Sequence, residues 1–203
     1  MTLADIVNGC PAIELAAGAT LNPDALTDVA LVVVDGGLVV LRSTVPGSAR
    51  RTITCHAGAG ALVLPPTEDE ALVALTDARL VTVSLAARDH LLGQAEAARV
   101  LFDGLSATLR QKHATIASMS RLHHVDRVRE KLLELAREHG RVGRDGVRLD
   151  FPLTHDLLGE MTGSARETVT RALDELQREG FVARRGRTYS VHVSPEELAG
   201  AAL

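Results

Sequence analysis

Aromatic residues and cysteines are scarce in this chain of 203 residues. It has no Trp, 1 Tyr and 3 Phe, so its cores must be aliphatic and little remains for stacking on single-stranded bases. Two cysteines, Cys10 and Cys55, are too few for a disulfide framework or a four-cysteine metal or iron–sulfur site, which points to a reducing cytoplasm. No stretch approaches the roughly 20 apolar residues that span a bilayer, and no basic start precedes an apolar run. We therefore expect neither export nor membrane insertion.

Positive charge is also in short supply, and it is unevenly distributed along the chain. The net charge is -4, yet residues 1–109 carry 6 basic and 12 acidic side chains, whereas residues 110–203 carry 16 and 14. An acidic amino-terminal half would be repelled by a DNA backbone and would leave the weakly basic half to face it. The length exceeds that of one average domain and suggests two.

The most specific pattern is the run G-S-A-R-E-T-V-T-R at residues 163–171. Ser164 precedes Glu167 by three positions, which predicts a capping box at the start of a helix running from Ser164 to Glu179, with Gly180 closing it. An apolar stripe follows at i, i+3, i+4 and i+7: Val169, Ala172, Leu173 and Leu176. Three charged side chains fall largely off this stripe: Arg166, Glu167 and Arg171. Arg can bind guanine and Glu can accept from cytosine, so these side chains suit readout of the major groove.

The flanking segments fit the same interpretation. Thr154 can cap a shorter helix that ends in the tight turn at residues 161–163, so two short helices form a helix-turn-helix. Downstream, residues 181–183 and 189–193 read as strands around a basic turn, with Arg184, Arg185 and Arg187 forming a wing. The alternative is a winged helix that packs against protein, with ordinary surface arginines.

Residues 154–193 resemble the winged helix-turn-helix of the cyclic-AMP receptor protein and fumarate-nitrate reductase regulator (CRP/FNR) family, and G-S-x-R-E-T-V-x-R resembles its cyclic-AMP receptor variant. The resemblance implies a homodimeric transcription regulator, not an enzyme, that reads a palindromic GTGA-like site in double-stranded DNA through Arg166, Glu167 and Arg171. It implies phosphate contacts for Thr154, His155 and Thr168. To these we add the hydroxyls and arginines nearby: Ser164, Thr170, Arg184, Arg185 and Arg187. RNA polymerase is a further candidate partner.

Residues 87–119 read as one long helix with apolar residues spaced alternately four and three apart. The seam is Leu91, Ala95, Ala98, Phe102, Leu105, Leu109, Lys112, Ile116 and Met119. Such spacing predicts a parallel two-stranded coiled coil, with Lys112 fixing the register. Alternatively the helix packs on its own amino-terminal domain, since Gly93 and Gly104 weaken a free-standing coil; both uses are compatible on different faces. The interdomain hinge is expected near His123.

The region before the long helix shows short β-rich runs with turn signals. Residues 30–34 and 38–41 flank Asp35-Gly36-Gly37, which predicts a hairpin. Further runs at residues 52–55, 61–64, 72–75 and 80–85 suggest a β-roll or jelly-roll barrel. The fold class is thus α+β: an amino-terminal barrel (1–86), a dimerisation helix (87–122) and a carboxy-terminal winged helix-turn-helix (123–203). By resemblance the barrel is a sensory domain.

Cyclic-nucleotide-binding members of the family use a Gly-Glu pair and an Arg-Ser pair in this barrel, for the ribose and the cyclic phosphate. Here residues 58–66 contain no Glu, and no Arg or Lys occurs between Arg51 and Arg79. Lys112 and His113 stand where cyclic-AMP binders place hydroxyl residues. We expect neither cyclic AMP nor another cofactor, and an effector-free regulator is slightly favoured over one that needs a ligand.

Two residues in the barrel leave another mode of control open. Cys55 beside His56 could serve a redox response or ligate haem, although alternation along a strand points the two side chains to opposite faces. A buried structural cysteine is the preferred interpretation. Because His56 is the sole histidine before His90, a three-histidine metal site is excluded, and with it the usual metalloenzyme barrel.

Overall fold

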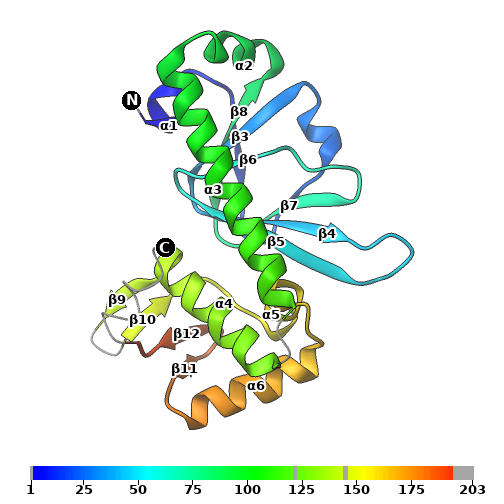
Figure 1. Ribbon diagram of the computed structural model, residues 1–203, viewed down its shortest axis with the longest axis vertical. Helices are drawn as coiled ribbons and strands as arrows, with labels where there is room; N and C mark the ends of the chain where they lie inside the picture. The colour runs from blue at the N-terminus through cyan, green and yellow to red at the C-terminus, as the bar shows by residue number, and fades with distance from the viewer. Residues whose placement is uncertain (1, 121–122, 144–145, 194–203) are drawn as a thin grey trace. The chain divides into compact units, whose positions relative to one another are not determined.

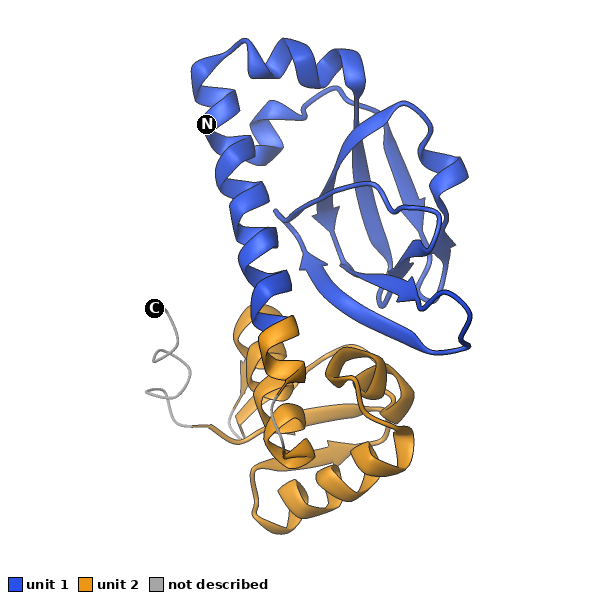
Figure 2. Ribbon diagram, turned by 45° about the vertical axis from the view of Figure 1, so that its right-hand side comes forward, with its two compact units in different colours: residues 1–115 blue, residues 116–203 orange. Residues whose placement is uncertain are grey.

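The computed structural model describes residues 2–120, 123–143 and 146–193. The chain forms two compact units, unit 1 (residues 1–115) and unit 2 (residues 116–203), which Figure 2 shows in blue and orange. The division falls inside the long helix, between residues 115 and 116, and the hinge expected near His123 stays a prediction. The barrel and most of the long helix therefore belong to one unit.

Unit 1 contains two antiparallel four-stranded sheets (Figure 1). The first has the strand order β1-β8-β3-β6 and comprises β1 (Ala12–Leu15), β8 (Ala78–Ser84), β3 (Val29–Gly36) and β6 (Leu62–Val63). The second has the order β2-β7-β4-β5 and comprises β2 (Thr20–Leu21), β7 (Glu70–Ala74), β4 (Leu38–Thr44) and β5 (Arg51–Gly58). A short helix α1 (Leu3–Ile6) and a 3-10 helix η1 (Pro23–Leu26) complete the part before α2. The expected α+β class with an amino-terminal β-roll is confirmed.

The predicted hairpin at residues 35–37 is wrong. Strand β3 pairs with β6 and β8, whereas β4 pairs with β5 and β7, so this turn carries the chain from one sheet to the other. The buried residues explain the difference: Val32 and Val34 lie in the core between the sheets, while Leu31 and Val33 pack in a second core with the helices. A strand buried on both faces belongs in a layered barrel rather than in an isolated hairpin.

Gly37 makes this crossing possible. Its φ is +81°, and a Cβ added there would lie 2.2 Å from the carbonyl oxygen of Asp77. We expect Gly37→Ala to lower the free energy of unfolding by more than the about 1–2 kcal/mol that a left-handed conformation costs a non-glycine residue. Gly47→Ala is the matched control, since Gly47 has a φ of +73° with nothing within 4 Å of the added Cβ. Equal losses in urea denaturation for both variants would contradict a steric role for Gly37.

The long helix predicted at residues 87–119 is two helices, α2 (Leu85–Leu92) and α3 (Ala95–Met119). The break falls at Gly93 and Gln94: the Gly93 amide still donates to Asp89, whereas α3 restarts with the amide of Ala98 donating to Gln94. Glycine favours such a break because it has a low helix propensity. Leu91 consequently sits on α2, where it is buried in the helix-facing core of unit 1.

Unit 2 holds the carboxy-terminal end of α3 and a helical domain with a small sheet. Its helices are α4 (His124–His139), α5 (His155–Thr162) and α6 (Arg166–Arg178). The sheet has the order β11-β12-β10-β9 and consists of β11 (Val182–Arg185), β12 (Thr188–Val191), β10 (Gly146–Leu149) and β9 (Arg141–Gly143). Among the helices in the described ranges, none is both long enough and apolar enough to cross a membrane.

Candidate nucleic-acid interface

The first helix of the predicted helix-turn-helix is confirmed. The Thr154 hydroxyl accepts a hydrogen bond from the amide of Leu157 at 3.1 Å and caps α5. The helix ends at Gly163, whose φ of 63° lies in the left-handed region, and the chain then turns into α6. Gly163 thus supplies the left-handed residue with which many helices end.

The predicted capping box at Ser164 is wrong. Helix α6 begins at Arg166 with Ala165 as its N-cap, and no side chain caps it. The Ser164 hydroxyl instead accepts a hydrogen bond from Arg127 at 3.2 Å, because Ser164 still belongs to the turn. Glu167 is consequently released from the capping role assigned to it, and its side chain is exposed.

Helix α6 has one buried face and one exposed face. The predicted apolar stripe is confirmed, since Val169, Ala172, Leu173 and Leu176 are all buried. The three predicted base-reading residues lie in the first two turns of the same helix and are exposed: Arg166, Glu167 and Arg171. Arg166 lies 3.7 Å from Asp156 on α5, which is also exposed and so constrains Arg166 little. Arg171 Nε lies 3.5 Å from the Glu167 carbonyl oxygen, which is the long limit of a hydrogen bond.

Two of the predicted phosphate-contacting residues form a pair between α5 and α6. His155 Nδ1 lies 2.8 Å from the Thr170 hydroxyl, which also donates to the Arg166 carbonyl oxygen. Burial lowers the pKa of His155 below its ordinary value, and the positive charges of Arg184 and Arg166 lower it further against the opposing effects of Asp174 and Asp156. Thr168, on the same helix, is half-buried. Burial is thus the main cause of the lowered pKa, and the two arginines add to it.

The predicted wing is confirmed as the hairpin of β11 and β12. Gly186, with a φ of 64°, forms the turn, and the Arg184 guanidinium donates to its carbonyl oxygen at 2.9 Å. Arg184, Arg185 and Arg187 are exposed around this turn. The Leu153 amide donates to the Arg187 carbonyl oxygen at 3.1 Å, so the wing is attached directly beside the start of α5.

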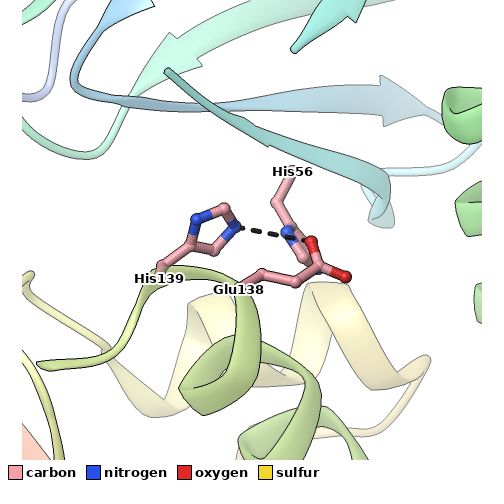
Figure 3. Close-up of side chains that lie close together, drawn as sticks. All are labelled: His56, Glu138 and His139. Carbon is pink, nitrogen blue, oxygen red and sulfur yellow. Dashed lines mark ion pairs between the residues drawn. The ribbon is translucent and has the colours of Figure 1, made fainter. Parts of the chain in front are cut away.

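Arg129 on α4 contacts the carboxy-terminal end of α6 and Phe181 beyond it, far from the start of the helix, and the sequence did not reveal these contacts. The Arg129 guanidinium lies over the Phe181 ring, 4.5 Å from its centroid, and forms an ion pair with Glu179 at the end of α6. At the last turn of α4, His139 Nε2 lies 3.8 Å from a carboxylate oxygen of Glu138, which makes an ion pair when the imidazole is protonated (Figure 3). From the sequence, an arginine such as Arg129 on an amphipathic helix is expected to lie in solvent. Its contact with the Phe181 ring is therefore seen only in the folded domain.

The predicted dimer seam lies on α3 except at its first position. Leu91 is on α2 and is 9% exposed, so it is excluded from a continuous seam. Phe102, Leu109 and Ile116, spaced by seven residues, are 70%, 54% and 58% exposed. The remaining positions are exposed or half-buried: Ala95, Ala98, Leu105, Lys112 and Met119. A different face of α3, with Ala97 and Leu101, is buried against the sheet. The helix therefore has one face that packs on its own amino-terminal domain and another that is exposed for the predicted coiled coil.

In the barrel, Cys55 and His56 point in different directions, as predicted. Cys55 is buried in the aliphatic core between the sheets. His56, on β5 (Figure 3), faces α3: its amide donates to the Gln111 side-chain oxygen at 3.2 Å, and its Nδ1 lies 3.3 Å from the Gln111 nitrogen. Arg79, the first cation after Arg51, pairs with Glu14 and Asp35.

Residues 126–200 match the family model of the Crp-like helix-turn-helix domain. The chain is 32% identical over 112 residues to a global nitrogen regulator of Synechococcus elongatus, covering 55% of this chain and 50% of that protein. It is 27% identical over 124 residues to a CRP-like cAMP-activated global transcriptional regulator of Mycobacterium tuberculosis, covering 61% and 54%. The chain thus spans about half the length of the curated relatives it matches.

Solved structures resemble the chain over nearly its full length. A CRP-family transcriptional regulator from Thermus thermophilus has a TM-score of 0.75 at 23% identity, covering 94% of this chain and 98% of that one. FixK2 from Bradyrhizobium japonicum has a TM-score of 0.77 at 21% identity, covering 94% and 96%. At this identity the likeness establishes the fold, whereas the helix-turn-helix match rests on sequence. Residues 126–200 therefore carry a Crp-like helix-turn-helix domain, and the chain has the fold of the solved CRP/FNR-type regulators.

Proposed function

We propose that this protein is a homodimeric, sequence-specific regulator of transcription that reads a palindromic, GTGA-like site in double-stranded DNA without control by cyclic AMP. The observation that carries the proposal is the exposed start of α6, where Arg166, Glu167 and Arg171 lie free of the core that fixes the helix. Side chains in the first turns of a recognition helix are those that reach base edges.

The surface around α6 has the charge and the hydroxyls that phosphates require. Arg184 and Arg166 both depress the pKa of His155, which means that their positive charges act at the start of α5. The Thr154 hydroxyl and the wing arginines add donors beside α6, and the Thr170 hydroxyl would have to leave the Arg166 carbonyl oxygen to donate to a phosphate. Phosphate contacts of this kind would fix the register of the helix on the duplex.

The dimer is proposed from α3. Three large apolar side chains at a spacing of seven residues, all more than half exposed, form the kind of stripe that a second copy of the same helix covers. A two-fold axis between paired α3 helices would place the two recognition helices in successive major grooves, about 34 Å apart, on a palindromic site.

Independence from cyclic AMP is proposed from the barrel. The loop after β5 supplies no carboxylate for a ribose, and Arg79 is already paired with two carboxylates. The burial of Cys55 in the aliphatic core and the hydrogen bond of His56 to Gln111 support structural roles for both residues. RNA polymerase is a separate candidate partner. Its recruitment by the DNA-bound dimer would be measured in transcription reactions on templates that carry the preferred site.

The test is selection of duplexes from a randomised pool by the purified protein, without added nucleotide. We expect a palindrome with GTGA-like halves, and an affinity that cyclic AMP leaves unchanged. Enrichment only in the presence of cyclic AMP would overturn the effector part of the proposal. Failure to enrich any sequence would favour the alternative, in which the winged helix contacts protein.

The lowered pKa of His155 predicts how the stability of the folded chain depends on pH. The unfolded chain takes up the proton near the ordinary value of 6.5, whereas the folded form resists protonation. The free energy of unfolding should therefore fall as the pH drops below 6.5, and level off once the folded form is also protonated.

The measurement is urea denaturation above and below that pH, for the natural chain and for His155→Gln. The variant should lose less stability on acidification, because the group with the lowered pKa is gone. His90→Gln, at a histidine in the last turn of α2, is the control and should leave the acid dependence due to His155 in place. Identical pH profiles for the natural chain and His155→Gln would contradict the assignment.

A further inference from the structure

Arg127 is a buried charged side chain on α4 that reaches two segments outside that helix. It is 8% exposed. Its Nη1 donates to the carbonyl oxygen of Met119, the last residue of α3, at 3.0 Å. Its Nη2 donates to the Ser164 hydroxyl at 3.2 Å and also contacts Nδ1 of His124. Ser164 stands directly before Ala165, the N-cap of α6.

This geometry needs an arginine. Burying a guanidinium is costly unless its donors are used, and its planar fork can serve acceptors on two segments at once. A second bond supports the same junction, since the Ser118 hydroxyl donates to the Glu130 carboxylate at 3.3 Å. The last turn of α3 and the residue before the recognition helix are thereby held to the same part of α4.

We propose that Arg127 is a positioning residue that selects the spacing between the two half-sites. The inference rests on the proposed function: if two copies pair through α3, the end of α3 is the fixed reference from which each recognition helix is placed. Adding one base pair between half-sites moves them apart by about 3.4 Å and rotates them by roughly 34–36°. A junction that holds α6 relative to the end of α3 would reject that change, and a loosened junction would tolerate it.

The experiment compares duplexes that carry the selected palindrome with one base pair added to or removed from its centre. The proteins are the natural chain, Arg127→Lys and Ser164→Ala. Lysine keeps the charge but lacks the fork, whereas Ser164→Ala removes one acceptor and keeps the buried arginine. We expect the preference for the natural spacing to shrink by about 2- to 30-fold in both variants, the size of coupling that such substitutions change. The base preference of Arg127→Lys within a single half-site should stay as it was.

The matched control is Arg129→Lys, on the same helix. It loses the Phe181 contact but leaves the junction between α3 and α6 intact, so the spacing preference should be retained even if the melting temperature falls. A natural chain that selects no sequence would overturn the proposed function and this inference with it. A natural chain with a fixed spacing preference that both Arg127→Lys and Ser164→Ala retain would overturn the role of Arg127 alone. If Arg127→Lys fails to fold, the test rests on Ser164→Ala, through the ratio of its affinities for the duplexes with the natural and the altered spacing.

Discussion

Replacing Arg171 by Ala should weaken binding to the preferred duplex by about 1–3 kcal/mol per half-site and relax the preference at one base position. The side chain is exposed on the second turn of α6 and its contact with a backbone carbonyl is long, so its loss should not disturb the core. Competition binding with all four base pairs at each half-site position measures both effects.

Arg178→Ala is the control for this change. Arg178 is exposed on the same helix but in its last turn, away from the end proposed to enter the groove. Its loss should reduce affinity for all sequences to a similar small extent, because a distant charge acts on phosphates rather than on bases. Equal effects of the two substitutions on base preference would show that α6 is not oriented as we propose.

If two copies pair through α3 as proposed, replacing Leu109 by Glu should convert the dimer to monomers. Leu109 lies at the centre of the exposed stripe between Phe102 and Ile116, so a second copy of α3 would bury the new carboxylate. An unpaired buried charge costs about 3–5 kcal/mol, which raises the dimer dissociation constant more than about a hundredfold. Sedimentation velocity over a range of protein concentrations measures the change.

Ala107→Glu is the matched control, since Ala107 is also exposed on α3 but points away from the stripe. It should leave the dimer intact. Neither substitution should lower the melting temperature of the monomer much, because both side chains face solvent there. A Leu109→Glu protein that remains dimeric would place the dimer contact elsewhere.

The recognition helix shows how far sequence patterns reach. Its buried stripe, its preceding helix and its basic wing follow from periodicities and turn residues that act over a few positions, and all three are confirmed. The capping box was wrong because α6 begins at Arg166 and leaves Ser164 in the turn, where its hydroxyl accepts a hydrogen bond from the buried Arg127. Glu167 therefore forms no capping box with Ser164, and its side chain is exposed.

In the barrel, by contrast, local sequence patterns did not predict which strands pair. The turn signal at residues 35–37 is real, yet the strands on either side pair with β8 and β7, which lie far away in the sequence: Val33 pairs with Val81 and Val39 with Ala74. Short strands such as β1 and β2 were also missed, since two to four residues carry little periodicity. Pairing partners are chosen by the burial of both faces, which no local window contains.

By itself the sequence determined the helix-turn-helix, the wing, the three exposed residues proposed to read bases and the heptad spacing of the long helix, because each depends on side chains a few positions apart. The tertiary structure alone decided where α2 ends and α3 begins, that Leu91 belongs to the core, and that β3 and β4 lie in different sheets. It alone brought Arg127 to Met119 and Ser164. These contacts join segments far apart in the chain, and their partners are settled by packing and by the need to satisfy buried polar groups.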